Sequence, residues 1–179
     1  MNWLSPLNML EIFIPQMYQK NIFSINYPLL KEKGINILIF DLDNTLSFID
    51  EKTPSNDVKS FINDLSKDFT IVIASNNTYN RVKTFCDNLN CDFIASSLKP
   101  LKKVAKIIKK RYSCSLDKIA IIGDQLVTDV FLGNRTGMLT ILVDPKGMKD
   151  LKITSFNKFI ENRIKKGINF QKGVYYEKK

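Results

Sequence analysis

Short apolar runs alternate along the chain with segments in which apolar residues recur at helical spacing. The runs cover residues 37–40, 70–74, 91–95, 119–122 and 138–143, lengths typical of buried strands. The helical spacing covers residues 56–67, 77–89, the stretch from Pro100 through Ile108, 128–134 and 156–164. This alternation predicts an α/β fold in which a parallel five-stranded sheet is flanked by helices and joined by right-handed crossovers.

The first apolar run ends abruptly at two carboxylates. Asp41 and Asp43 are two positions apart, so in extended backbone they leave the same face while Leu42 points back into the core. Two acids at the end of a buried strand repel each other and lose hydration unless a cation or a proton compensates. An isolated Asp-x-Asp can also end a strand in a solvated turn. Whether this pair is functional therefore depends on the rest of the chain.

Three further apolar runs end in groups suited to an anion or a cation. The run at 70–74 leads into Ser75 and Asn76, and the run at 91–95 leads to Lys99. The run at 119–122 ends in Gly123 and Asp124, with Asp129 five positions later. Because parallel strands bring their carboxyl ends to one edge of an open sheet, where ligands bind, these side chains are expected to form a single site.

These segments resemble the four motifs of the haloacid dehalogenase (HAD) superfamily of phosphotransferases, in the same order along the chain. Residues 41–45 match its DxDxT motif, Ser75 the second, Lys99 the third, and residues 123–129 the GDxxxxD fourth. The flanking sequence is similar to the class IIIA, YqeG-type group, which includes mitochondrial phosphatidylglycerophosphatases. The resemblance covers roughly residues 3–167 and implies a Rossmann-like HAD fold; the last dozen residues match nothing recognisable.

The resemblance implies a Mg²⁺-dependent phosphomonoester hydrolase that converts phosphatidylglycerophosphate to phosphatidylglycerol through an aspartyl-phosphate. By this resemblance Asp41 is the nucleophile and a metal ligand. Asp43 is the general acid and base, and its backbone carbonyl binds the metal. Asp124 completes the metal shell, and Asp129 ligates the metal or orients the site.

The resemblance also implies a set of phosphate-binding residues, namely Asn44, Ser75, Asn76 and Lys99. Some residues near them have structural alternatives. Asn44 and Thr45 can shape the turn after the first strand, Asn77 is expected to cap the following helix, and Thr128 can be a helix N-cap.

The spacing between the motifs leaves no room for a sizeable cap domain. Only 31 residues separate Asp43 from Ser75, and 23 separate Ser75 from Lys99. Each gap is filled by one helix and the next strand. An uncapped site can meet a substrate too large to enclose, such as a lipid at a membrane surface, although uncapped relatives also hydrolyse soluble sugar phosphates.

Length and composition agree with one globular domain. The chain has 179 residues, interpreted as an N-terminal extension at 1–33 that packs on or near the sheet, a catalytic core at 36–145, and a basic C-terminal helix and tail at 146–179. It has no histidine, which argues against a zinc site and against Ser-His-Asp chemistry. Three cysteines without Cys-x-x-Cys spacing indicate reduced thiols and a cytoplasmic location. No apolar stretch is long enough to span a bilayer, and the N-terminus does not read as a signal peptide.

The net charge of +9 indicates which kind of partner the protein could bind. Residues 146–179 contribute +7 of it, and the segment at 102–111 adds a second group of lysines and arginines. A charge run is often only a solvated face; otherwise anionic membrane fits better than nucleic acid. Apolar residues near the N-terminus can lie in a membrane interface or, as preferred here, pack on the sheet: Trp3, Leu4, Leu7, Leu10, Phe13 and Ile14.

The sequence therefore predicts a phosphatase with peripheral membrane contact and leaves its oligomeric state open. Two alternatives stay open: a phosphatase of soluble nucleotide or sugar phosphates, and a non-enzymatic HAD-fold module that binds RNA or ribosomes. The charged residues at the motif positions argue against the non-enzymatic module, because a scaffold has no need of carboxylates that repel each other. These residues are Asp41, Asp43, Lys99 and Asp124.

Overall fold

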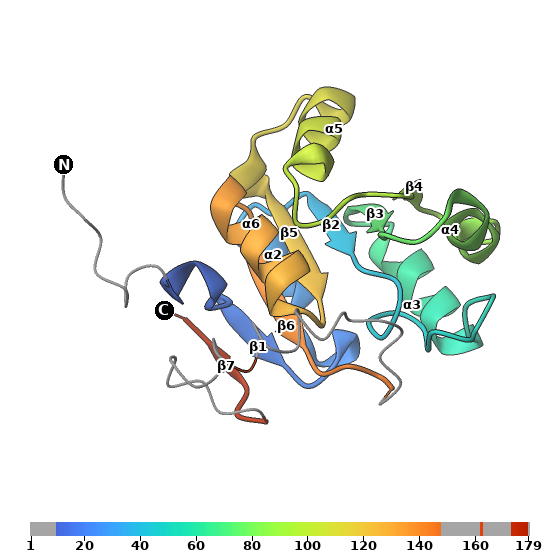
Figure 1. Cartoon of the computed structure of the whole chain (residues 1–179), viewed down its shortest axis with the longest axis horizontal. Coiled ribbons are helices and arrows are strands. Elements are labelled where there is room, and N and C mark those ends of the chain that lie inside the picture. Colours follow the sequence, from blue (N-terminus) through green and yellow to red (C-terminus); the bar gives the residue numbers. More distant parts are fainter. Residues whose placement is uncertain (1–9, 148–161, 163–172, 179) are drawn as a thin grey trace.

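A computed structural model describes residues 10–147, 162 and 173–178, and its centre is a seven-stranded sheet in the order β4-β3-β2-β5-β6-β1-β7 (Figure 1). All neighbouring strands are parallel except β1 and β7. The strands are β1 (Met17–Gln19), β2 (Ile37–Phe40), β3 (Thr70–Ala74), β4 (Asp92–Ile94), β5 (Ile119–Gly123), β6 (Leu139–Val143) and β7 (Tyr176–Glu177).

The five expected strands are confirmed, but the sheet has seven. The two additional strands, β1 and β7, extend it beyond β6. Both are short and lie beside polar residues, outside any apolar run, so the sequence pattern did not mark them as strands. Their pairing depends on the partner edge: the Gln16 backbone N–H donates to the Thr140 carbonyl at 3.1 Å, which starts the register of β1 on β6.

Helices cover both faces of the sheet. α2 (Tyr27–Glu32), α3 (Asn56–Leu65) and α4 (Tyr79–Cys86) bury Leu30, Ile62 and Phe85 against Phe40 on one face. α5 (Lys103–Tyr112) and α6 (Phe131–Thr136) cover the other face, where Ile108 packs near strands β2 and β5. The remaining helical turns are η1 (Glu11–Phe13), η2 (Ile22–Ser24), η3 (Leu116–Lys118) and a π-helical turn, η4 (Leu126–Val130).

Two expected helix starts are wrong. Pro100 lies in a turn, and α5 begins three residues later at Lys103. Thr128 is not an N-cap, because the chain enters η4 two residues earlier, with Gln125 at the N-cap position. The helix expected at 128–134 ends at Thr136, and Gly137 has a φ of 82° that ends α6 in the left-handed region.

Only part of what was expected for the two ends of the chain falls on described residues. Phe13 stacks on Phe131 with ring centroids 4.9 Å apart, and Leu10 packs beside it, which favours packing over a membrane-facing segment here. Trp3, Leu4 and Leu7 lie outside the described residues, as does the expected helix at 156–164 apart from residue 162. No helix in the described ranges is long and apolar enough to cross a membrane.

The connections after β2 and β3 are short. Between β2 and β3 the only helix is α3, and between β3 and β4 it is α4; both connections are fully described. The expectation that no sizeable cap is inserted there agrees with this arrangement. The carboxyl ends of the central strands are therefore not covered by an inserted domain.

Candidate active site

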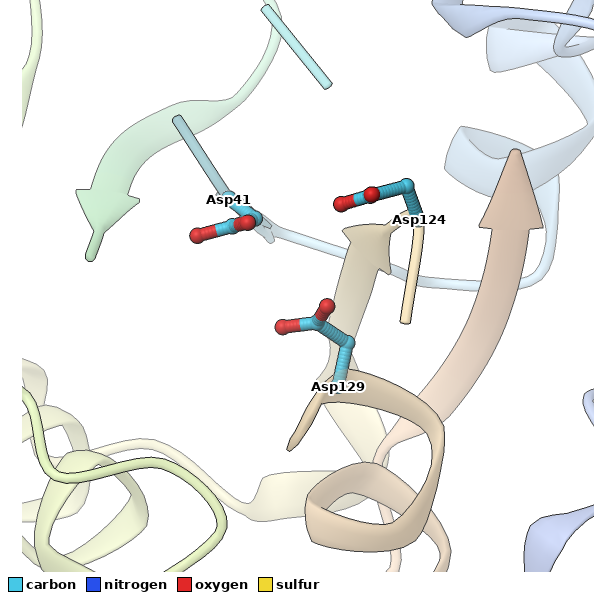
Figure 2. Close-up of side chains that lie close together, drawn as sticks. All are labelled: Asp41, Asp124 and Asp129. Carbon is cyan, nitrogen blue, oxygen red and sulfur yellow. The ribbon is translucent and has the colours of Figure 1, made fainter. Parts of the chain in front are cut away.

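Three carboxylates converge at the carboxyl ends of β2 and β5, the neighbouring strands at the centre of the sheet. Asp41 directly follows β2, Asp124 directly follows β5, and Asp129 lies in η4. One carboxylate oxygen from each lies within 4.8 Å of the others, and Figure 2 shows the side chains pointing into one space. Strands bring Asp41 and Asp124 together although 82 residues separate them in the sequence.

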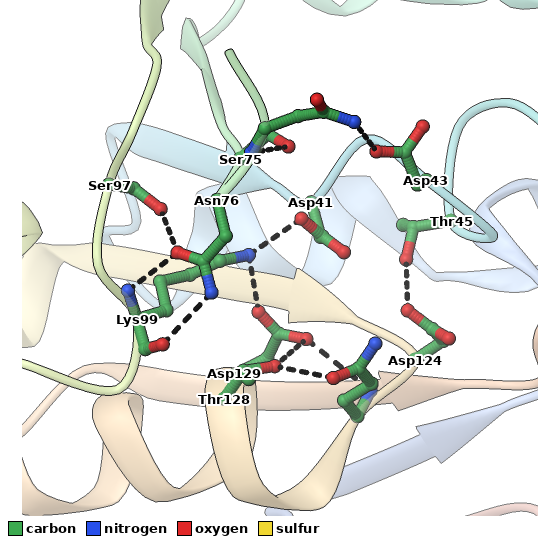
Figure 3. A network of polar contacts seen from close by, with 12 residues as sticks. Asp41, Asp43, Thr45, Ser75, Asn76, Ser97, Lys99, Asp124, Thr128 and Asp129 are labelled. Atoms are coloured by element: carbon green, nitrogen blue, oxygen red, sulfur yellow. Dashed lines mark hydrogen bonds and ion pairs between the residues drawn. The ribbon is translucent and has the colours of Figure 1, made fainter. Parts of the chain in front are cut away.

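Lys99 joins this cluster from the loop after β4. Its side chain is only 2% exposed, and its Nζ donates to Asp41 Oδ1 at 2.7 Å and to Asp129 Oδ1 at 2.7 Å (Figure 3). A lysine this deeply buried is stable only when carboxylates compensate for its lost hydration. The four expected residues Asp41, Lys99, Asp124 and Asp129 are thus brought together.

Asn76 fixes the loop that carries Lys99. Its side-chain Oδ1 accepts hydrogen bonds from the Lys99 backbone N–H and from the Ser97 hydroxyl, both at 2.7 Å. Its Nδ2 donates to the Lys99 carbonyl at 2.9 Å. The side-chain amide of Asn76 therefore holds protein backbone (Figure 3), which leaves its backbone N–H as the group to consider for phosphate.

Gly123 is required by the approach of Asp129. A Cβ at Gly123 would lie 2.3 Å from the Asp129 carboxylate, closer than any real contact. The Asp129 Oδ2 accepts from the Thr128 hydroxyl at 3.1 Å and from the Gln125 backbone N–H at 3.3 Å. Asp129 is thus held on both oxygens, one by η4 and one by Lys99, and it positions the lysine.

The charges in the cluster do not balance. Burial raises the pKa of Asp41 to about 6, where Lys99 opposes and Asp129 reinforces the rise. Burial, aided by Asp41 and Asp129, raises the pKa of Asp124 well above its usual value. Burial lowers the pKa of Lys99, but the two carboxylates outweigh it and raise the pKa overall. Three carboxylates face one buried lysine, which is an environment that suits a divalent cation bound by oxygen ligands.

Asp43 lies in a separate environment. Its Oδ1 accepts from Arg81 Nη2 at 2.9 Å, and its Oδ2 accepts from Asn77 Nδ2 at 3.1 Å. Arg81 is 15% exposed, and its guanidinium lies over the Phe85 ring at 5.7 Å. Neither Arg81 nor this role of Asn77 was expected; in the sequence Arg81 is one basic residue on a helix, with no signal that its face meets Asp43.

The other expected residues have the following positions. Ser75 is buried at the end of β3, and its Oγ accepts from the Asn77 backbone N–H at 3.1 Å. Asn44 has a φ of 64° and its N–H donates to the Ser47 carbonyl at 2.7 Å, as the turn alternative expects. The Thr45 hydroxyl donates to Asp124 Oδ1 at 3.2 Å and so orients that carboxylate. The expectation that Asn77 caps α4 is wrong: the N-cap position is Thr78, and Asn77 Oδ1 accepts from the Thr78 N–H at 2.9 Å.

Comparison with known proteins places the chain among phosphatases. The family model described as mitochondrial PGP phosphatase matches residues 2–147. The chain belongs to this family. It is 34% identical over 168 residues to the probable phosphatase YqeG of Bacillus subtilis, covering 93% of this chain and 98% of that protein. It is 24% identical over 145 residues to the chloroplastic/mitochondrial phosphatidylglycerophosphate phosphatase 1 of Arabidopsis thaliana, covering 75% of this chain and 42% of the plant protein.

Among solved structures, a hypothetical protein from Xanthomonas campestris has the same fold. The TM-score is 0.54 at 12% identity, over 77% of this chain and 79% of that one. The family match and the YqeG relative confirm the expected HAD superfamily phosphatase of the YqeG type. They argue against the hypothesis of a non-enzymatic module.

Proposed function

We propose that this member of the PGP phosphatase family removes the terminal phosphate of phosphatidylglycerophosphate, or of a close lipid analogue, in a Mg²⁺-dependent reaction through an aspartyl-phosphate on Asp41. One observation supports the chemistry above all. A buried carboxylate at the end of the central strand is paired with a buried lysine and lies beside two further carboxylates. This arrangement offers a nucleophile, a cation for phosphate and ligands for a metal.

In the first step an Asp41 carboxylate oxygen attacks phosphorus, and the bond from phosphorus to the leaving oxygen breaks. Lys99 contacts Asp41 at 2.7 Å, so its charge neutralises negative charge on the transferring group as well as on the nucleophile. The proton that the leaving alkoxide needs comes from Asp43. Ser75 and the Asn76 backbone N–H are the proposed contacts for the remaining phosphate oxygens.

In the second step water attacks the aspartyl-phosphate, inorganic phosphate leaves, and Asp41 returns as a carboxylate. Asp43 takes the proton from this water. The ion pair with Arg81 presents Asp43 as a carboxylate, the form that accepts a proton. Proton donation in the first step requires the protonated carboxyl group of Asp43, turned from Arg81 toward the leaving oxygen; donation leaves the carboxylate that accepts the proton of water in the second step.

The residues that would hold Mg²⁺ are Asp41, Asp124 and the backbone carbonyl of Asp43, with Asp129 orienting the set through Lys99. When bound, the metal supplies positive charge that offsets repulsion between the anionic nucleophile and the phosphate. The uneven charge of the cluster supports this assignment, because Lys99 by itself compensates only part of three carboxylates.

Family membership and the absence of an inserted cap support the lipid substrate. The Arabidopsis relative is named for phosphatidylglycerophosphate, and the family for PGP. The segments after β2 and β3 contain one helix each, so a headgroup has no cap to pass before it reaches Asp41. A lipid can therefore stay in its bilayer while its phosphate enters the site.

The test is phosphate release from phosphatidylglycerophosphate in mixed micelles with Mg²⁺, beside a panel of soluble nucleotide and sugar phosphates. Asp41→Asn is the inactive variant, and Asp50→Asn, an exposed acid after the same strand, is its matched control. Turnover of the lipid that is lost on chelation and in Asp41→Asn supports the proposal. Turnover of soluble esters alone overturns the lipid substrate, and no turnover of any ester overturns the mechanism.

A further inference from the structure

Exposed hydrophobic side chains gather on the segments that surround the candidate active site. Of seven exposed large hydrophobic side chains among the described residues, four follow the carboxyl ends of β2, β3 or β4: Phe48, Tyr79, Leu98 and Leu101. These are the same segments that contribute Asp41, Ser75 and Lys99 to the site. Exposed apolar groups and site residues are therefore carried by the same segments.

Leu98 and Leu101 lie on either side of buried Lys99 in the sequence and are 53% and 56% exposed. Leu98 has a φ of 57°, a left-handed conformation that disfavours a bulky side chain and suits Asn or Gly. Its side chain contributes little to the core, so neither packing nor backbone preference explains a leucine here. Residues that break a local rule without a structural gain are candidates for a binding role.

One of these leucines, Leu101, lines a groove together with lysines. The groove has a volume of about 410 Å³ and is lined by Leu101, Ile107 and three lysines at the start of α5: Lys102, Lys103 and Lys106. No acidic side chain lines it. Lys103 Nζ donates to the Ser96 carbonyl at 2.9 Å, which ties the helix start to the loop that carries Lys99. Beside the β2 segment, Lys146 lies 5.7 Å from the centre of the Phe48 ring.

We propose that this rim, defined as Phe48, Tyr79, Leu98, Leu101, Lys102 and Lys106, docks on an anionic lipid bilayer and holds the open site against it. The inference rests on the proposed lipid substrate and adds the surface by which the enzyme reaches it. Leucine and aromatic side chains enter the interfacial region, while lysines contact lipid phosphates. The mixture of exposed leucines and lysines favours a bilayer over nucleic acid, whose backbone attracts lysines but gives leucines no gain.

The first experiment measures sedimentation of the full-length protein with vesicles of phosphatidylcholine, with and without phosphatidylglycerol, which needs no turnover. Leu98→Asn/Leu101→Asn removes apolar surface, and Asn suits the left-handed φ at position 98. Phe23→Asn is the matched control, because Phe23 is 48% exposed and contacts Phe61 on α3. We expect the double variant to bind anionic vesicles at least about tenfold more weakly and the control to change by less than about twofold.

A second pair of variants tests the charge. Lys102→Gln/Lys106→Gln removes two rim lysines, and Lys33→Gln/Lys59→Gln removes two exposed lysines, one at the C-cap of α2 and one in α3. Each rim lysine is expected to strengthen binding to anionic vesicles about fivefold at low salt, and added salt should erase this difference. The control pair should retain most of the binding.

Hydrolysis of a soluble phosphate monoester by the same proteins separates this inference from the proposed function. The rim variants should keep that activity while losing vesicle binding and lipid turnover. Equal vesicle binding by the wild type and Leu98→Asn/Leu101→Asn overturns the docking surface, as does equal binding to neutral and anionic vesicles. If the wild type binds RNA, and the rim variants lose this RNA binding but keep their vesicle binding, the docking surface is also overturned. Failure to hydrolyse any ester would instead overturn the proposed function and leave the vesicle result valid.

Discussion

Asp41 and Asp43 are two positions apart on one segment, yet their surroundings differ in charge. Asp41 is buried with Asp124 and Asp129 around a single lysine, so negative charge is in excess. Asp43 is paired with Arg81 and held by Asn77, so its charge is matched. The difference teaches that alternation along extended backbone does not give two carboxylates the same chemistry. The neighbouring loops and helices decide which carboxylate lies in an excess of negative charge and which one is paired with a cation.

The strongest way to break this comparison is to remove each carboxylate separately. Asp41→Asn should lower phosphate release at least about 10⁴-fold, because it removes the nucleophile of the proposed reaction. Asp43→Asn should lower it about 10²–10⁴-fold, the usual contribution of a general acid or base. Initial rates at saturating substrate test both, and Asp41→Asn with more than about one hundredth of wild-type activity would contradict its role as nucleophile.

Lys99 tests the excess of charge around Asp41. Lys99→Met should lower activity about 10²–10³-fold and destabilise the metal-free protein by about 3–5 kcal/mol, because the two buried carboxylates that it contacts, Asp41 and Asp129, lose their cation. Urea denaturation with and without Mg²⁺ measures the second effect, and Mg²⁺ should restore part of the stability.

Lys110→Met, on the exposed side of α5, is the control for that substitution. It should change both quantities little. If the two variants have the same stability, the lysine at position 99 does not compensate the cluster.

The raised pKa of Asp41 predicts how stability depends on pH without metal. Because its folded pKa of about 6 lies above its usual value, Asp41 stabilises the fold at low pH, and this contribution is lost as pH rises from about 4 to 6. Asp41→Asn should therefore be more stable than the wild type by about 2–3 kcal/mol at pH 7.5, with little difference at pH 4. Thermal unfolding in chelator measures this. A constant difference across that range would contradict the assigned cause, and Mg²⁺ should stabilise the wild type more than the variant.

Substitution of Arg81 should have the smallest effect on activity, and it tests most directly whether Arg81 orients Asp43. Arg81→Met should lower kcat about tenfold, because Asp43 loses the group that orients it. In an Asp43→Asn background the same substitution should have almost no effect, since there is no carboxylate to orient. Arg81→Lys should recover part of the activity. Equal losses in both backgrounds would mean that Arg81 acts independently of Asp43.

The sequence predicted the order of the core elements well. Alternating apolar runs and helical spacing predicted five of the seven strands, from Ile37–Phe40 to Leu139–Val143, because each corresponds to an apolar run that alternates with a helical segment. It did not reveal β1 and β7. These two short segments lie in no apolar run, and they become strands only because β1 pairs with the edge of β6 and β7 pairs with β1.

For the site, the sequence was enough to predict which groups lie at the strand ends. Asp41, Ser75, Lys99 and Asp124 follow apolar runs, and parallel strands must bring those ends to one edge. Only the tertiary structure decided how these groups pair. It turned the Asn76 side chain to the Lys99 loop, brought Arg81 of α4 to Asp43, and packed Asp129 on Gly123. Such pairings depend on helix rotation and loop path, which long-range packing sets and local periodicity does not encode.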